Sequence, residues 1–175
     1  MNVAYLSLGS NIDKEDNLVD AVDLLAKHGR LLAVSPVYET EAVGNPDDPT
    51  FFNAAVMLLT PLSAAQLKET VLRKIEAQLG RRRHDDPNAP RTIDLDISLF
   101  NNEVLTLGKR QIPDPEILLY PHVVVPLADV APDYVHPQTG ERLQDIACRV
   151  LRNSRQFLIR QEEIDLAPAI WPVLD

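Results

Sequence analysis

The chain has 175 residues, 45% of them hydrophobic and 25% charged, which is ordinary for one globular domain with a substantial core. Its formal net charge of −9 argues against a general nucleic-acid-binding protein, since such proteins are usually basic. The single cysteine, Cys148, excludes an internal disulfide framework and a cysteine-based zinc cluster, and no apolar run is long enough to cross a membrane.

The first third of the chain alternates strand-like and helix-like patterns. Residues 3–8 predict a strand, and residues 31–38 and 52–59 predict two more strands. Between the first two strands, residues 14–28 carry apolar side chains at the spacing of an amphipathic helix. We expect Gly29 to end this helix, because glycine readily adopts the left-handed conformation found after helix C-termini.

A second helix and a fourth strand follow. Ser63 begins a capping-box pattern that opens a helix, and Gly80 is placed to end it. Residues 92–100 predict the fourth strand, with a hairpin turn at Asn101-Asn102 leading into residues 104–105. The resulting order, βαββαβ, predicts an α+β domain with a ferredoxin-like core and an antiparallel sheet.

The remaining sequence is predicted to be less regular. Residues 113–121 show no periodic pattern, whereas residues 143–151 predict a short helix. Residues 152–175 look peripheral to the core. We therefore expect the domain to occupy residues 1–150, with residues 151–175 as a C-terminal extension of the same domain.

Two aspartates lie close together in the fourth predicted strand. Side chains alternate along a strand, so Asp94 and Asp96 should point to one face, with Cα atoms about 6.6 Å apart. Two neighbouring carboxylates repel each other unless a cation lies between them or one takes a proton. The opposite face should belong to the core, because it carries Ile93, Leu95, Ile97 and Leu99.

Arginines gather next to this strand in an otherwise acidic protein, at positions 81, 82, 83 and 91. Guanidinium groups bind phosphate oxygens in pairs, so arginines beside two metal-binding carboxylates suit a polyphosphate. The sequence contains neither a P-loop nor the motifs of protein kinases. Taken alone, the aspartates could lie on a solvated strand face and the arginines could serve a helix dipole, but their adjacency favours a site.

Several collinear motifs resemble the 6-hydroxymethyl-7,8-dihydropterin pyrophosphokinase family of folate biosynthesis, over roughly residues 2–147. The strongest match is residues 89–97, which include Pro90, Arg91, Asp94 and Asp96. Further matches lie at residues 8–11, 35–40, 52–56, 75–76, 80–81 and 125–132.

The resemblance implies that the β,γ-diphosphate of ATP, the co-substrate, is transferred to the pterin hydroxymethyl group and that AMP is released. Asp94 and Asp96 would hold two Mg²⁺ ions, and Arg81 and Arg91 would act with them on the phosphates. The nucleotide would also contact Arg73, Glu76, Arg83 and Ile97. The pterin would be bound by Thr40, Val43, Phe51, Asn53 and His122.

The chain also departs from the family pattern. Pro87 and Asn88 stand where the family usually has an arginine and a tryptophan, and Asp114-Pro115 replaces His-Pro. Tyr120 replaces a common arginine, and His122 replaces a second phenylalanine that stacks on the pterin. Asp114-Pro115 is also typical of a helix N-cap followed by a first-turn proline. The departures affect the nucleotide contacts more than the metal pair or the pterin pocket.

Two other functions stay open at this point. One is a different metal-dependent phosphoryl- or nucleotidyltransferase, since palm-like ferredoxin folds also carry an Asp-x-Asp motif. The other is a pterin- or nucleotide-binding relative that has lost catalysis. In each case we expect small-molecule partners, with no nucleic acid and no membrane. The N-terminal sequence has no signal-peptide pattern, so we expect a cytoplasmic protein, and we expect it to be a monomer.

Overall fold

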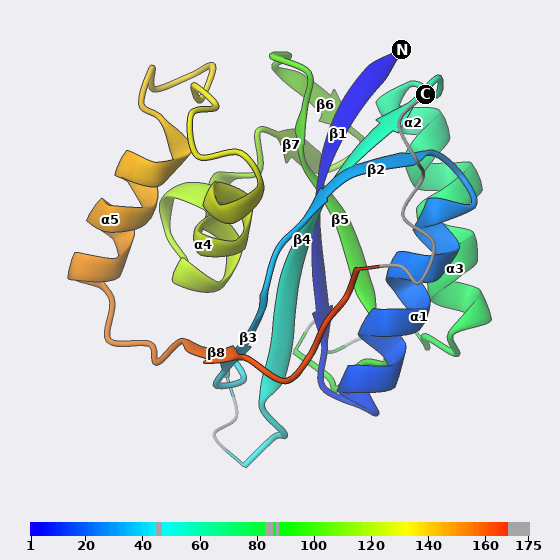
Figure 1. Ribbon diagram of the computed structural model, residues 1–175, viewed down its shortest axis with the longest axis vertical. Helices are drawn as coiled ribbons and strands as arrows, with labels where there is room; N and C mark the ends of the chain where they lie inside the picture. The colour runs from blue at the N-terminus through cyan, green and yellow to red at the C-terminus, as the bar shows by residue number, and fades with distance from the viewer. Residues whose placement is uncertain (45–46, 83–85, 87, 168–175) are drawn as a thin grey trace.

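The centre of the molecule is a six-stranded sheet, seen in a computed structural model that describes residues 1–44, 47–82, 86 and 88–167 (Figure 1). The strand β1 (Asn2–Ser10) lies between β4 (Phe51–Thr60) and β5 (Asp94–Phe100), and it is antiparallel to both. The remaining strand pairs of this sheet are also antiparallel. The predicted α+β, ferredoxin-like fold class is confirmed.

The strand predicted over residues 31–38 is in fact two strands. β2 (Arg30–Val34) pairs with one part of β4, and β3 (Val37–Thr40) pairs with another. At the break, the Ser35 N–H donates to the Ala55 carbonyl (2.9 Å) and the Ser35 Oγ accepts from the Ala55 N–H (2.8 Å). The next residue, Pro36, has no N–H to donate, which interrupts a regular ladder.

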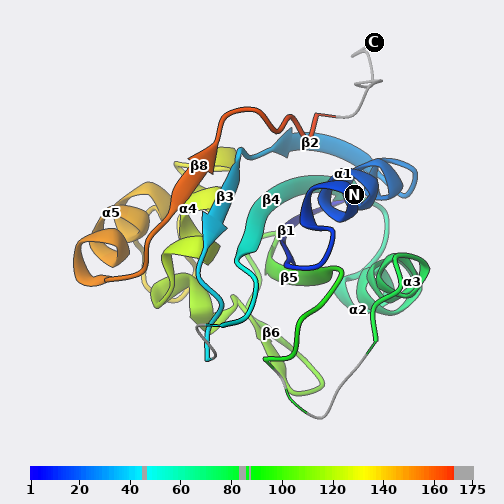
Figure 2. The ribbon, with the colours of Figure 1, turned by 90° about the horizontal axis from the view of Figure 1, so that it is seen from below.

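Helices of the βαββαβ core cover one face of the sheet (Figure 2). They are α1 (Lys14–Ala26), then α2 (Ala64–Leu67), a π-helical turn η1 (Lys68–Leu72) and α3 (Arg73–Gln78). The predicted capping box is confirmed, because Ser63 Oγ accepts from the Gln66 N–H and Gln66 Oε1 accepts from the Ser63 N–H. The second helix ends before Gly80, whose φ of +77° lies in the left-handed region.

Gly29 does not serve as the predicted helix stop. The helix α1 ends at Ala26, and the N–H groups of Lys27 and His28 bond back to Leu24 and Leu25. A Cβ atom at position 29 would lie 2.6 Å from the Leu59 carbonyl oxygen, inside van der Waals contact. Glycine is therefore required here because the backbone passes close to β4.

The other face of the sheet is covered by α4 (Pro121–Val130) and α5 (Leu143–Asn153), which confirms the helix predicted near the C-terminus (Figure 1). Before them, Asp114 caps a short 3-10 helix, η2 (Pro115–Leu118), by accepting a hydrogen bond from the Glu116 N–H (2.9 Å). This confirms the N-cap pattern at Asp114-Pro115. A second hydrophobic core forms under these helices from Leu99, Val124, Leu127, Leu143, Ile146 and Val150.

The strand β5 contains an irregularity that changes which face its side chains join. Ile97 is opposite Leu6 and Leu99 is opposite the adjacent Tyr5, so Ser98 is an extra residue in this strand. Ile93, Leu95 and Ile97 pack into the core under α1 and α3, as predicted. The prediction for Leu99 was wrong, because the bulge turns this side chain to the α4 and α5 side.

The predicted hairpin between β5 and residues 104–105 was also wrong. β6 (Leu105–Leu107) pairs with β7 (Arg110–Ile112) in a separate two-stranded sheet, and Gly108 supplies the turn with a φ of +60°. Asn101 holds the chain to β1 instead, because it donates its N–H to the Val3 carbonyl and its Oδ1 accepts from the Val3 N–H. The chain then leaves the sheet at a left-handed Asn101 (φ +47°).

Part of the segment predicted to be peripheral joins the sheet. β8 (Ile159–Gln161) pairs with β3 and forms the edge of the sheet, and Leu166 is buried in the main core. Residues 168–175 of the predicted extension lie outside the described residues. Within the described part of the chain, none of the helices combines the length and apolar character needed to span a bilayer.

Candidate active site

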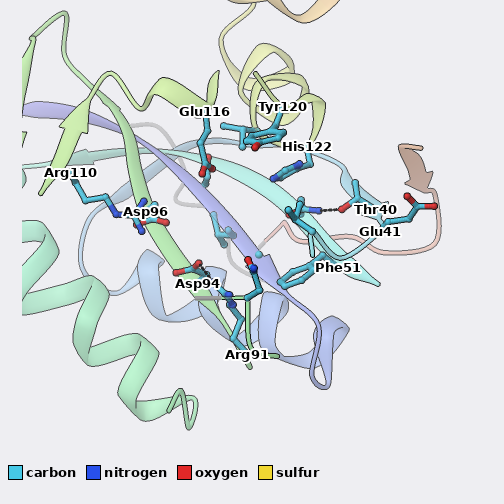
Figure 3. A pocket seen from close by; sticks show the side chains of 17 residues that line it. Thr40, Glu41, Phe51, Arg91, Asp94, Asp96, Arg110, Glu116, Tyr120 and His122 are labelled. Atoms are coloured by element: carbon cyan, nitrogen blue, oxygen red, sulfur yellow. Dashed lines mark hydrogen bonds and ion pairs between the residues drawn. The ribbon is translucent and has the colours of Figure 1, made fainter. Parts of the chain in front are cut away.

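The acidic pair of β5 lines a cavity of about 470 Å³ beside β1 (Figure 3). In the sheet register Asp94 is opposite Gly9 and Asp96 is opposite Ser7, so small residues leave room above both carboxylates. Asp94 is held at both oxygens, by Arg81 Nη1 at Oδ1 (2.7 Å) and by Arg91 Nη1 at Oδ2 (2.9 Å). The structure therefore brings together all four residues that the sequence predicted to be catalytic.

Both of these arginines are fixed by further bonds. Arg81 Nη1 donates to the Ile93 carbonyl (2.7 Å) and lies 3.6 Å from Glu76 Oε1, which accepts from the Leu95 N–H (3.0 Å). The Arg91 N–H donates to Asn11 Oδ1 (2.7 Å), and its Nε donates to the Ala89 carbonyl (3.3 Å). The guanidinium groups are consequently well ordered before any phosphate arrives.

The acidity of Asp96 is strongly perturbed. Burial, and after it the charge of the nearby Asp94, raise the pKa of Asp96 to about 7 although the ion pair with Arg110 (3.2 Å) lowers it. A carboxylate whose negative charge is this poorly compensated attracts an added cation. Carboxylate oxygens are also the ligands that Mg²⁺ prefers in proteins.

A pocket of aromatic and amide groups opens on the same cavity. All five residues predicted to bind the pterin line it, namely Thr40, Val43, Phe51, Asn53 and His122. The Asn53 amide is almost completely buried, and its Nδ2 donates to Thr40 Oγ1 (2.9 Å). In Figure 3, Phe51 from β4 and His122 from α4 face the cavity from different sides. A flat heterocycle could stack between such rings, with its edge read by the amide.

Tyr120 and His122 form a stacked pair, with ring centroids 5.3 Å apart and an interplanar angle of 29°. The His122 Nδ1 lies 3.1 Å from Gln156 Oε1, and burial lowers the pKa of this imidazole below its usual value. The ring is therefore neutral at pH 7 and can stack as an uncharged aromatic group. The two departures from the family pattern at positions 120 and 122 thus preserve an aromatic wall.

A smaller cavity of about 90 Å³ lies on the other side of the acidic pair. Asp94, Asp96 and Arg110 line both cavities, and the smaller one is completed by Lys68, Leu72, Arg73, Glu76, Arg81 and Leu95. Of the residues predicted to contact nucleotide, Arg73 and Glu76 are therefore at this cavity, and Arg73 pairs with Glu69. The Ile97 side chain is 7% exposed and packs in the main core instead. Arg83 and Pro87 lie outside the described residues.

Some site residues were missed from the sequence. The larger cavity is also lined by Glu41, Asn88, Arg110 and Glu116. Arg110 is two residues before the buried Ile112 on β7, so strand alternation could have placed both on the inward side. Placing Arg110 in this way requires the pairing of β6 with β7. The predicted hairpin at Asn101-Asn102 had instead paired residues 104–105 with β5.

The ordered arginines, the paired carboxylates and the adjoining aromatic pocket supply what an enzyme of phosphoryl transfer to a flat heterocycle needs. Residues 5–132 match the family model described as 7,8-dihydro-6-hydroxymethylpterin-pyrophosphokinase (HPPK). The chain therefore belongs to this family, which confirms the resemblance.

Curated relatives agree with this assignment. The 2-amino-4-hydroxy-6-hydroxymethyldihydropteridine pyrophosphokinase of Bacillus subtilis is 38% identical over 85% of this chain and 90% of its own length. The enzyme of the same name from Pseudomonas aeruginosa is 37% identical over 81% of this chain and 88% of its own length. The folic acid synthesis protein fol1 of Schizosaccharomyces pombe is 38% identical over 82% of this chain, which spans only 20% of that longer protein.

The fold is also shared with a solved structure. Wild-type Plasmodium falciparum HPPK-DHPS with pterin and p-hydroxybenzoate matches 87% of this chain with a TM-score of 0.67. The identity is 15%, and the match covers 42% of that chain, so the comparison supports the fold alone.

Proposed function

We propose that the protein transfers the β,γ-diphosphate of ATP to the hydroxymethyl group of 6-hydroxymethyl-7,8-dihydropterin and releases AMP, a step in folate biosynthesis. The family model and the names of the full-length relatives support this reaction. The structural observation that carries the proposal is that Asp94 and Asp96 line two cavities at once. One cavity has the features of a heterocycle site, and the other has those of a nucleotide site.

In the proposed complex the pterin occupies the larger cavity. Phe51 and His122 stack on the ring, and the Asn53 amide bonds the polar edge, with help from Thr40 and Val43. Support comes from the placement of all five residues on this cavity. Asn53 is also fixed by its bond to Thr40, so binding the pterin would need little side-chain reorganisation.

The nucleotide is proposed to enter from the smaller cavity. Arg73 and Glu76 line this cavity, and Arg83 and Ile97 are carried over from the family resemblance alone. The pterin hydroxyl oxygen attacks the β-phosphorus, and the bond from that phosphorus to the oxygen bridging to the α-phosphate breaks. Arg81 and Arg91 can stabilise the charge that develops on these oxygens, since both guanidinium groups are already ordered.

Mg²⁺ is proposed to be held by Asp94 and Asp96. Support comes from the raised pKa of Asp96, caused by burial and by the charge of Asp94, since a divalent cation would offset both effects. The described residues contain no cluster of three or more protein groups placed to ligate a metal. Two carboxylates that share the ion with phosphate oxygens are nevertheless the usual protein contribution to Mg²⁺ in such sites. When bound, the ion would neutralise phosphate charge.

The test is to incubate the protein with Mg²⁺, ATP and 6-hydroxymethyl-7,8-dihydropterin and to follow AMP. We expect AMP from the wild type, and activity reduced by several orders of magnitude in Asp94→Asn, which removes one carboxylate charge while keeping its shape. Pterin binding without AMP release would show a binding protein that has lost catalysis. Failure of both would favour another metal-dependent phosphotransferase.

Four further expectations remain proposals. The protein is expected to be cytoplasmic, which cell fractionation would check. It is also expected to be a monomer without nucleic-acid partners, which light scattering after gel filtration and a nucleic-acid titration would check. Residues 151–175 are proposed to be an extension of the same domain that occupies residues 1–150. The pairing of β8 with β3 supports this, because it ties the extension to the sheet.

A further inference from the structure

The ring of His122 has a polar edge in a wall that is otherwise suited to stacking. Burial lowers the pKa of this imidazole, so at pH 7 the ring is neutral and carries a single N–H. A buried N–H needs an acceptor, because leaving it unsatisfied costs stability. A phenylalanine ring has no such group, so a histidine at this position brings a need that an apolar ring would not.

Gln156 supplies the acceptor. Its Oε1 lies 3.1 Å from His122 Nδ1. An amide oxygen only accepts hydrogen bonds, so this contact places the ring proton on Nδ1 and leaves Nε2 unprotonated. The bond also restrains rotation of the ring about its Cβ–Cγ bond, for which an imidazole otherwise has broad freedom.

The two faces of the ring have different surroundings. Tyr120 stacks on one of them, with ring centroids 5.3 Å apart and an interplanar angle of 29°. In Figure 3, Tyr120 lies on the side of His122 away from Phe51, so the opposite face of the imidazole is turned to the cavity. Gln156 lines a neighbouring groove together with Tyr120, and it therefore reaches the ring from behind this wall.

Gln156 lies in a segment that is anchored at both ends. After α5 ends at Asn153, the chain crosses to the sheet and enters β8, which pairs with β3 (Figure 1). At the first end, Ser154 Oγ accepts from the Gln156 N–H (3.0 Å). At the second end, Gln161 Nε2 donates to Glu39 Oε2 (3.3 Å). The glutamine is thus held from both sides, so its hydrogen bond can fix the ring.

We propose that Gln156 is a positioning residue of the pterin site: it holds the His122 imidazole as the Nδ1–H tautomer, stacked on Tyr120, with the other face free for the pterin. The match to the family model ends at residue 132, so the positioning group comes from the C-terminal segment beyond that match. The inference rests on the proposed function, because it assumes that the pterin stacks on His122.

The first test determines the tautomer without any substrate. The ring nitrogens of His122 are observed in the full-length protein at pH 8 by long-range proton–nitrogen NMR, and they are assigned by the signals that His122→Phe removes. We expect Nδ1 to carry the proton in the wild type. In Gln156→Met, which keeps the length of the side chain but removes the acceptor oxygen, we expect the Nε2–H tautomer to form. Gln156→Glu keeps an acceptor oxygen and should keep the Nδ1–H tautomer.

The second test is a double-mutant cycle on the affinity for 6-hydroxymethyl-7,8-dihydropterin, measured by fluorescence titration. Gln156→Met should weaken binding about 3- to 10-fold, the range for one neutral hydrogen bond, because the released ring must be ordered again when the pterin binds. In a His122→Phe background the same substitution should change the affinity less than about 1.5-fold, because phenylalanine has no N–H to hold.

Gln138→Met is the matched control. Gln138 is an exposed glutamine that contacts another histidine, His136, through its backbone N–H (3.3 Å), which methionine keeps. Its replacement should leave the tautomer of His122 and the pterin affinity unchanged. If Gln156→Met does not fold, Gln156→Ala takes its place, with the same expected results.

An Nε2–H tautomer in the wild type, or an Nδ1–H tautomer that persists in Gln156→Met, would overturn the proposal. Equal losses of pterin affinity from Gln156→Met with and without His122→Phe would also overturn it, and would assign Gln156 to the general structure of the C-terminal segment. If the wild type binds no pterin, the proposed function fails instead. The tautomer comparison still decides in that case whether Gln156 orients His122.

Discussion

Replacing Asp96 with asparagine is expected to stabilise the metal-free protein at alkaline pH. The side chain keeps its shape and loses a charge that folding removes from water and places beside Asp94. In the native protein the pKa of Asp96 is raised from 3.8 to about 7. The native state therefore binds this proton more tightly than the unfolded chain, and its stability falls as pH rises between these values.

The size of the effect follows from the two pKa values. A shift of this size corresponds to about 4 kcal/mol of destabilisation above pH 7, since one pKa unit is worth about 1.4 kcal/mol. At pH 5 only about 2 kcal/mol of this penalty is present. Between pH 5 and pH 8 the asparagine variant should thus gain about 2–3 kcal/mol relative to the wild type.

Urea unfolding at pH 5, 6, 7 and 8, followed by circular dichroism in the presence of a chelator, measures this difference. The ion pair with Arg110 forms only when Asp96 is ionised, so its contribution is already contained in the pKa of Asp96 and is not added separately. Asp133→Asn is a suitable control, because that side chain is 81% exposed. If the stability of Asp96→Asn falls with pH as steeply as that of the wild type, the electrostatic account of Asp96 is wrong.

Asn53→Ala should weaken pterin binding about 10- to 100-fold, because a buried amide bonded to Thr40 is lost. Fluorescence titration measures this affinity. A loss under threefold would contradict the assignment of Asn53 to the pterin site. Burial lowers the pKa of His122 below 6.5, so its imidazole is mainly neutral above that pH. The affinity for the pterin should therefore stay within about twofold between pH 6.5 and 8. A change in this affinity near pH 7 would show that the ring is charged. Gly29→Ala should lower the free energy of unfolding, measured with urea, by about 1–3 kcal/mol, because the new Cβ would contact the Leu59 carbonyl too closely. An unchanged free energy of unfolding would show that β4 can move to accommodate the Cβ.

The sequence predicted the local features of the fold well. The capping box at Ser63 and the stop at Gly80 depend on hydrogen bonds within one turn, which the residues themselves specify. The break at Ser35 was missed because it is stabilised by Ala55 on a neighbouring strand. The bulge at Ser98 likewise depends on the register with β1, and a simple alternation pattern cannot show it.

In the candidate site too, residues placed by local motifs could be predicted, and contacts that depend on packing between distant segments could not. The aspartates and most of the pterin residues could be placed from motifs because they lie on β3, β4 and β5 or at the start of α4, whereas Val43 lies in the loop after β3. Arg110 could not, because its contact with Asp96 depends on how the hairpin packs against β5. The replacement of an arginine by Tyr120 also became intelligible only from its stacking on His122.

The position of the β6–β7 hairpin has a consequence for how this enzyme can change during evolution. The inner strands of the central sheet have a hydrophobic core on each face, so a substitution there disturbs packing and stability together. On the hairpin, Thr106 and Gln111 are exposed, and the inward Ile112 alone is fully buried. Substitutions at these exposed hairpin positions, close to Arg110 and Asp96, should therefore cost the fold little stability. The other residues that line the smaller cavity, such as Arg73, Glu76 and Leu95, lie on α3 and β5, so the hairpin is the part of this cavity that can change at least cost to the core.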